Sequence, residues 1–139
     1  MICYAVIDTN VLVSALLSGK ADAATVKVIN RVLAGIITPV YSSAIMHEYK
    51  IVLNREKFGF TKETVNYLLL AIEKFGVRVN PSFVDISLPD PKDVPFYVVV
   101  LEKQNDHAYL VTGNTKHFPK KNFVVTPRQL IDILNEKSN

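Results

Sequence analysis

The chain of 139 residues has a single cysteine, Cys3, so one copy can form neither a disulfide nor a cysteine-based zinc site. No apolar run approaches the roughly 20 residues that a membrane span needs. The N-terminus also lacks the basic lead and the small-residue cleavage site of a signal peptide. The three histidines are His47, His107 and His117. None of them has the paired spacing of metal ligands on a helix. We therefore expect a cytoplasmic protein without a membrane segment.

Glycine is also scarce, at five residues, and no glycine-rich run follows the first apolar segment. P-loop and dinucleotide-binding sites both need such a run, because the backbone must come close to the phosphates. Both kinds of site are therefore excluded. Hydrophobic content of 49% and charged content of 21% are those of an ordinary folded protein, and the length predicts one domain over residues 1–139.

The first apolar segment, residues 2–7, is apolar at every position and is followed directly by Asp8. A strand of this kind needs cover on both faces, which is typical of parallel sheets under helices. Ligands bind outside the carboxyl ends of such strands, so Asp8 is the first candidate for chemistry. The alternative is an Asx-turn, in which Asp8 and Asn10 hold backbone amides.

The rest of the chain alternates strands and helices, which predicts an α/β fold with a doubly wound, mainly parallel sheet. The strands expected after the first are residues 36–41, 77–79, 108–112 and 122–125. The expected helices are residues 10–18, 22–34, 43–54, 62–75, a helix opened by Asp93, and 127–135. Pro39 favours an edge position for the second strand, or a place at its start. Residues 80–92 form the one long connection, and such connections are often functional.

The segment after Asp93 is ambiguous. Residues 96–101 are β-branched and aromatic, so their propensity alone favours a strand. Asp93 is a good N-cap, however, and a proline such as Pro95 is tolerated within the first helical turn. Since a helix also preserves the alternation, we predict a helix.

Polar side chains recur at the ends of the predicted strands or at the starts of the helices that follow, and they are Asp8, Glu48, Asp93 and Asn114. All of them can lie at one edge of the sheet. Clustered carboxylates repel one another, and their burial is costly unless a cation is present. Oxygen ligands select Mg²⁺ or Mn²⁺, and such an ion can activate a water against a phosphodiester. For Glu48 the alternative is an ion pair with Lys50 or Arg55 on a helix surface.

The net charge of +3 permits binding to a polyanion without demonstrating it. Two basic clusters stand out, one in residues 116–121 and the other in residues 50–57. The first contains Lys116, His117, Lys120 and Lys121. For each cluster the alternative is a solvated, lysine-rich face.

Four motifs occur in order along the chain: Ile7–Val13, the predicted helix with Glu48, Asp90–Phe96 and Leu110–Phe118. Together they resemble the PIN-domain family, and within it the toxin-like branch that includes VapC-like ribonucleases of bacterial and archaeal toxin–antitoxin pairs. The likeness extends over about the whole chain. It implies a Rossmann-like three-layer sandwich that carries a metal-dependent endoribonuclease, which is a hydrolase of RNA phosphodiester bonds.

The resemblance also implies roles for individual residues. The three principal acids of the family, which would hold Mg²⁺ or Mn²⁺, are matched by Asp8, Glu48 and Asp93. The polar residues that support the first acid are matched by Thr9 and Asn10. At the fourth position, beside Thr112, many relatives carry an acid where this chain has Asn114. Asparagine can orient a water on the metal but brings no charge, so one-ion and two-ion chemistry both stay open, and Asp90 is an acid that could compensate.

The resemblance further implies partners. In the nuclease hypothesis, the RNA backbone is met by Lys116, His117 or Lys120. The family likeness suggests a homodimer and a small antitoxin protein that blocks the acidic cleft.

Two other classes of function stay open. One is a non-catalytic module that binds RNA or a protein partner, for which Asn114 is the best argument. The other is a phosphoacceptor domain with Asp8 as the acceptor. An aspartyl-phosphatase would need a further acid where this chain has Asn10, and receiver domains place the acceptor after a later strand.

Overall fold

The computed structural model describes residues 2–82 and 85–137, and within them five parallel strands form one sheet in the order β3-β2-β1-β4-β5. The strands are β1 (Cys3–Ile7), β2 (Ile37–Tyr41), β3 (Val77–Arg78), β4 (Tyr109–Val111) and β5 (Val124–Val125). The six flanking α-helices of this part of the chain are α1 (Thr9–Leu17), α2 (Ala24–Leu33), α3 (Ser43–Leu53), α4 (Lys62–Phe75), α5 (Val94–Glu102) and α6 (Pro127–Lys137). The fold is thus the α/β three-layer arrangement that the strand–helix alternation predicts.

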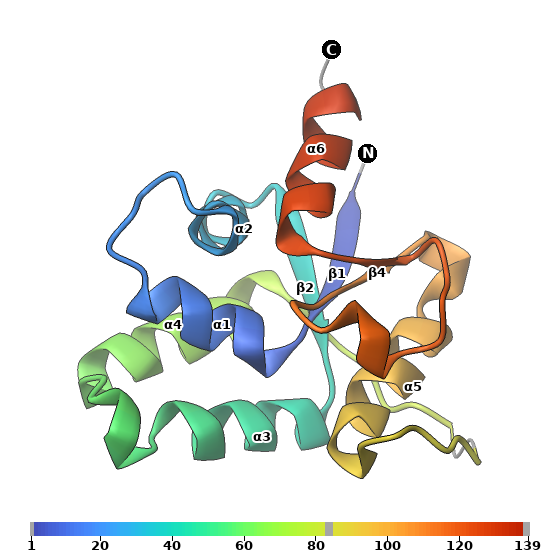
Figure 1. Cartoon of the computed structure of the whole chain (residues 1–139), viewed down its shortest axis with the longest axis horizontal. Helices are drawn as coiled ribbons and strands as arrows, with labels where there is room; N and C mark the ends of the chain where they lie inside the picture. The colour runs from blue at the N-terminus through green and yellow to red at the C-terminus, as the bar shows by residue number, and fades with distance from the viewer. Residues whose placement is uncertain (1, 83–84, 138–139) are drawn as a thin grey trace.

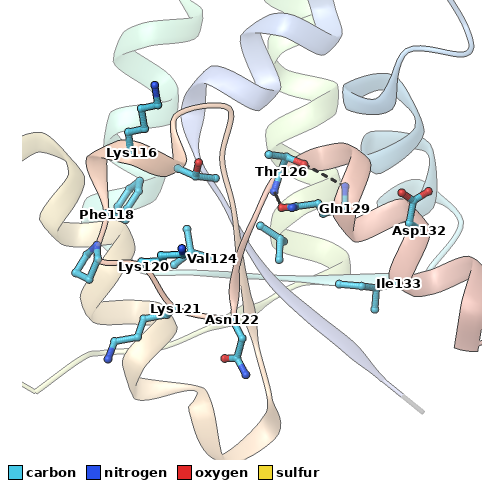
Figure 2. Close-up of a pocket in the computed structure, with 13 residues that line it drawn as sticks. Lys116, Phe118, Lys120, Lys121, Asn122, Val124, Thr126, Gln129, Asp132 and Ile133 are labelled. Carbon is cyan, nitrogen blue, oxygen red and sulfur yellow. Dashed lines mark hydrogen bonds between the residues drawn. The ribbon is translucent and has the colours of Figure 1, made fainter.

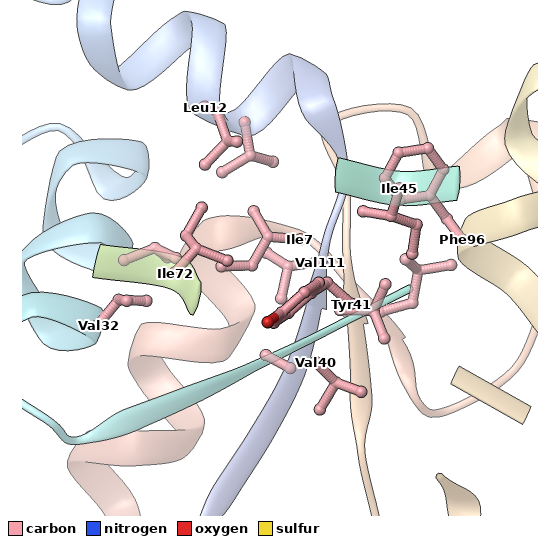
Figure 3. Close-up of a cluster of buried hydrophobic side chains, with 14 of the residues drawn as sticks. Ile7, Leu12, Val32, Val40, Tyr41, Ile45, Ile72, Phe96 and Val111 are labelled. Atoms are coloured by element: carbon pink, nitrogen blue, oxygen red, sulfur yellow. The ribbon is translucent and has the colours of Figure 1, made fainter. Parts of the chain in front are cut away.

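Helices cover both faces of the sheet. Helices α1, α2 and α4 lie on one side of it and α5 on the other (Figure 1). The core between these layers is apolar and includes Ile7, Leu12, Ile45, Phe96 and Val111, all at most 1% exposed. Figure 3 shows side chains from the helices and from the central strands β1, β2 and β4 meeting there. This double cover explains why residues 3–7 are apolar at every position.

The order of the strands places a topological switch point at the middle of the sheet. The chain moves from β1 outward to β2 and β3, and then returns to β4 on the other side of β1. The direction of winding therefore changes between β1 and β4. In open α/β sheets, ligands bind at such a switch point, outside the carboxyl ends of the strands.

The predicted helix after Asp93 is confirmed, as α5. A short 3₁₀ turn, η2 (Pro91–Asp93), precedes it, and the Asp90 side chain caps this turn by accepting a hydrogen bond from the Lys92 amide at 2.9 Å. Phe96 and Val100 of α5 are buried against the sheet. Tertiary packing therefore outweighs the β propensity of these residues.

The edge position for Pro39 is wrong, because β2 lies between β3 and β1. Pro39 pairs with Ala5 of β1, whereas β3 begins only opposite Val40. The missing amide is therefore tolerated because the short neighbour β3 pairs only with the part of β2 that follows Pro39. Gly76, which precedes β3, permits this packing, since a Cβ there would lie 2.6 Å from the Pro39 carbonyl oxygen.

Helix α1 begins at Thr9, one residue before the predicted start, and Asp8 occupies its N-cap position. Positions 83 and 84 of the predicted long connection, residues 80–92, lie outside the described residues.

In the part of the chain that the structure describes, none of the helices has both the length and the apolar character of a membrane span.

Candidate active site

Buried polar side chains gather at one edge of the sheet. Among the described residues, the polar or charged side chains that are buried are Asp8, Thr9, Ser42 and Thr112. Asp8 and Thr9 follow β1 directly, Ser42 follows β2, and Thr112 follows β4. Every one of them thus lies at the carboxyl end of a strand, next to the switch point of the sheet.

Asp8 is held by the neighbouring strand. The parallel register pairs Ile7 with Val111, so the next residues, Asp8 and Thr112, lie side by side. The Asp8 amide donates to the Val111 carbonyl at 2.9 Å. The Thr112 hydroxyl donates to Oδ2 of Asp8 at 2.7 Å and accepts from the Asn114 amide at 3.0 Å. The alternative Asx-turn is not formed by Asp8, whose side chain makes no capping hydrogen bond to α1.

Glu48 reaches the same edge from α3. This helix begins where β2 ends, and the Ser42 hydroxyl caps it by accepting from the Ile45 amide at 3.2 Å. One turn further, Glu48 is half-buried, and its Oε2 accepts a hydrogen bond from the Thr9 hydroxyl at 3.2 Å. The alternative role of Glu48, an ion pair with Lys50 or Arg55, is not observed among the described residues.

Asp93 comes from the third direction, at the start of α5. Nδ1 of His117 lies 3.4 Å from Oδ2 of Asp93, which is too long for a strong hydrogen bond. This Oδ2 atom is buried and has no hydrogen-bond partner among the described residues. An acceptor oxygen of this kind is left for a ligand to satisfy.

The three carboxyl groups influence one another electrostatically. Burial raises the pKa of Asp8 to about 6; the Thr112 hydrogen bond opposes this shift, and the negative charges of Asp93 and Glu48 add to it. The pKa of Asp93 is also raised, first by burial and then by the charge of Asp90, while His117 opposes the shift. A neighbouring negative charge raises the pKa of a carboxyl group. The contributions of the acids to these two shifts therefore indicate an excess of negative charge at this edge.

A hard divalent cation fits this donor set. The acids offer oxygen ligands alone, their charges repel one another, and Asp93 has a buried oxygen without a partner. Within the described ranges, however, no three histidine, cysteine or acidic side chains are arranged so that they could hold a metal ion as they stand. Asp8 and Glu48 each accept a hydrogen bond from a threonine hydroxyl, that of Thr112 and that of Thr9, whereas Oδ2 of Asp93 lies near His117 without a hydrogen bond. The expectation of a ready-made ligand group is therefore not met.

The other predicted site residues surround this cluster. Asn10 accepts from the Gly113 amide at 3.4 Å, which is a weak tie between α1 and the segment after β4. Asp90 is half-buried and caps η2. Asn114 is exposed, and its side chain makes no hydrogen bond within the described part of the chain. Lys116 and Lys120 are exposed farther along the same segment.

Tyr49 belongs to this edge, although the sequence places it only in an apolar stripe. Its hydroxyl donates to the carbonyl of Ile7 at 2.5 Å, so it holds the last residue of β1 against α3. Burial raises the pKa of this hydroxyl, and the charges of Asp8 and Glu48 raise it further, so it stays a donor. A buried tyrosine usually finds a hydrogen-bond partner, but this partner lies 42 residues away and the sequence does not identify it.

Comparison with known proteins identifies one family. A family model described as a PIN domain matches residues 4–116, which include most of β1, all of β2 to β4 and all three acids. The match ends before β5 and α6, so it covers less of the chain than the motif likeness suggests. No curated protein and no solved structure matches this chain.

Proposed function

The chain belongs to the PIN-domain family, and we propose that it is an endoribonuclease that requires Mg²⁺ or Mn²⁺. The fold of this family is that of a nuclease, and its members are usually metal-dependent nucleases. The observation that carries the proposal is the position of Asp8, Glu48 and Asp93 at the carboxyl edge of the sheet, where burial and then their mutual charges raise the pKa values of Asp8 and Asp93. Substrate-binding sites of α/β folds occur at this place.

In this proposal the ion would be held by Asp8, Glu48 and Asp93. When bound, it supplies an activated water and neutralises charge on the phosphoryl oxygens. The other residues position these acids. Thr112 and Thr9 fix two of the carboxylates, and Asn10 ties the segment after β4 to α1.

The remaining polar residues face the substrate in this proposal. Asn114 is exposed beside the cluster, where its amide can orient a water or a phosphate oxygen without adding charge. His117 lies next to Asp93, and Lys116 and Lys120 offer positive charge to the RNA backbone.

The test is cleavage of labelled single-stranded RNA by the purified protein. We expect cutting with Mg²⁺ or Mn²⁺, no cutting with EDTA, and a loss of about 100-fold or more in Asp8→Asn, because a ligand contributes at least as much as the groups that support it. Asp22→Asn is the matched control, since Asp22 is exposed in the loop between α1 and α2. Undiminished cutting by Asp8→Asn would refute the proposal.

A second candidate is a non-catalytic module that binds RNA or a protein partner. It is favoured by the uncharged Asn114 and by the lack, among the described residues, of a ready-made ligand group. Thermal unfolding separates the two candidates when it is combined with the cleavage assay. Stabilisation by Mn²⁺ without cleavage of any RNA favours the module, whereas stabilisation with cleavage favours the enzyme.

We also propose, from the motif likeness, that the enzyme is the toxin of a cytoplasmic toxin–antitoxin pair. It would act as a homodimer and be inhibited by a small antitoxin protein over the acidic edge. The expected result is growth arrest when the chain is expressed alone in bacteria, and no arrest with Asp8→Asn. Arrest that persists in Asp8→Asn would contradict a toxin role based on cleavage.

A further inference from the structure

A groove of about 830 Å³ lies outside the acidic cluster, between the segment 115–122 and helix α6. Residues of β5 and of α6 line it, and its lysines lie along the segment before β5 (Figure 2). The family match ends at Lys116, so most of this groove belongs to the part of the chain that the family model does not include.

The rim of the groove is positively charged. Lys116, Lys120 and Lys121 line it, are exposed, and form no ion pair among the described residues. The one acid in its lining, Asp132, is paired with Arg128 at 3.8 Å. Three unpaired lysines along one wall favour an anionic, extended ligand.

The floor of the groove is apolar. It is formed by Val124, Val125 and Ile133, and the polar residues around it include Asn122, Thr126 and Gln129. The backbone amide of Thr126 and the side chain of Gln129 are joined at 2.9 Å in the capping box of α6, which fixes this end of the groove. An apolar floor beside a basic wall suits a ligand with flat apolar faces and a charged backbone, as single-stranded nucleic acid has.

The groove borders the candidate active site along the chain. The short turn η4 (Thr115–His117) serves both, because His117 lies beside Asp93 while Thr115 and Lys116 line the groove. A strand whose phosphate lies at the acids can thus continue along the lysines without leaving the surface.

We propose that this groove binds the segment of single-stranded RNA next to the bond that is cut, with Lys116, Lys120 and Lys121 on its phosphates. This inference rests on the proposed nuclease function. The volume lies within the range of roughly 300–1,000 Å³ that is typical of ligand sites. A duplex does not offer unstacked bases to the floor, so the groove selects single strands.

The test is binding of a fluorescent single-stranded RNA, followed by anisotropy in EDTA so that no RNA is cut. We expect Lys120→Ala combined with Lys121→Ala to weaken binding by roughly 10- to 30-fold at about 0.1 M salt, and to reduce the salt slope by about 1.4. The matched control is Lys20→Ala combined with Lys62→Ala, which removes the same charge from exposed sites elsewhere and should change binding by about twofold or less. A duplex of the same sequence should bind more weakly than the single strand.

The outcomes separate this inference from the proposed function. Weaker binding by the groove variant, without cleavage by the unmodified protein, supports the groove and contradicts the nuclease. Cleavage by the unmodified protein, with unchanged binding by the groove variant, contradicts the groove alone. Equal losses in the groove and control variants would also overturn it. So would a changed oligomeric state at unchanged RNA affinity, which would make the groove an interface between copies.

Discussion

Ile7 and Asp8 are neighbours in the chain and are buried to nearly the same degree, with exposed fractions of 1% and 6%. Burial of Ile7 stabilises the fold by roughly 1.5–3 kcal/mol, as for other large apolar side chains. Burial of Asp8 has the opposite sign when the carboxyl group is ionised, because its charge leaves water beside two other acids. The interior of the sheet therefore stabilises the protein, whereas its carboxyl edge lowers stability at neutral pH and is suited to bind a cation.

The largest effect should come from the interior. Leu110→Ala removes a fully buried side chain from β4 and should lower the free energy of unfolding by about 2–5 kcal/mol. Leu70→Ala is the matched control, because Leu70 is 63% exposed on α4, and it should change stability by less than about 0.5 kcal/mol. Urea unfolding measures both. Equal losses of stability in the two variants would show that burial does not determine the effect of these substitutions.

The second expected effect, that of replacing Asp8, is smaller and raises the free energy of unfolding instead of lowering it. The pKa of Asp8 in the folded protein, about 6, lies above the ordinary value of 3.8. The folded state therefore binds a proton more tightly than the unfolded state, and the stability of the metal-free protein should fall as the pH rises from about 4 to 6. Asp8→Asn should remove up to about 3 kcal/mol of this loss at pH 8.

Unfolding in urea at several pH values with EDTA tests this effect. The unmodified protein and Asp8→Asn should differ most above pH 6 and converge near pH 4. If Asp8→Asn were less stable than the unmodified protein at pH 8, burial of the ionised Asp8 would not lower the stability of the protein as we expect.

The smallest expected change in stability concerns a residue of the carboxyl edge itself. Thr112→Val removes the hydroxyl that donates to Asp8 and should lower stability by about 1–2 kcal/mol at pH 8, because a buried carboxylate loses its donor. The loss should shrink below pH 5, where Asp8 is protonated in the folded state. Thr38→Val, the same chemical change in β2, is the control. A loss that does not vary with pH would mean that Thr112 acts through packing alone.

The parts of the fold that the sequence predicts are those with local signals. The capping box of Thr126 and Gln129 predicts the start of α6, and both of its hydrogen bonds are present. The proximity of Asp8 and Thr112 follows from parallel pairing, since the carboxyl ends of adjacent strands meet at one edge. The helix after Asp93 could be predicted from the strand–helix alternation and from the proline in its first turn, although the Asp93 side chain makes no capping hydrogen bond and Asp90 caps the preceding turn instead.

The parts that could not be predicted depend on contacts between distant residues. The interior place of Pro39 depends on the shortness of β3, and the sequence does not give the pairing partner of a strand. The bond from Tyr49 to Ile7 and the contact of His117 with Asp93 join segments that only the folded chain brings together. The roles of the site residues stay predictions until the variants are measured.

The two strands that close the sheet, β3 and β5, have two residues each. Open rows of amide and carbonyl groups allow sheets to recruit further chains and to grow into fibrils, and here these rows are very short. The protein should therefore resist aggregation by strand addition, even at high concentration. If two copies associate, their contact should be made through helices and side chains rather than through a continuous sheet.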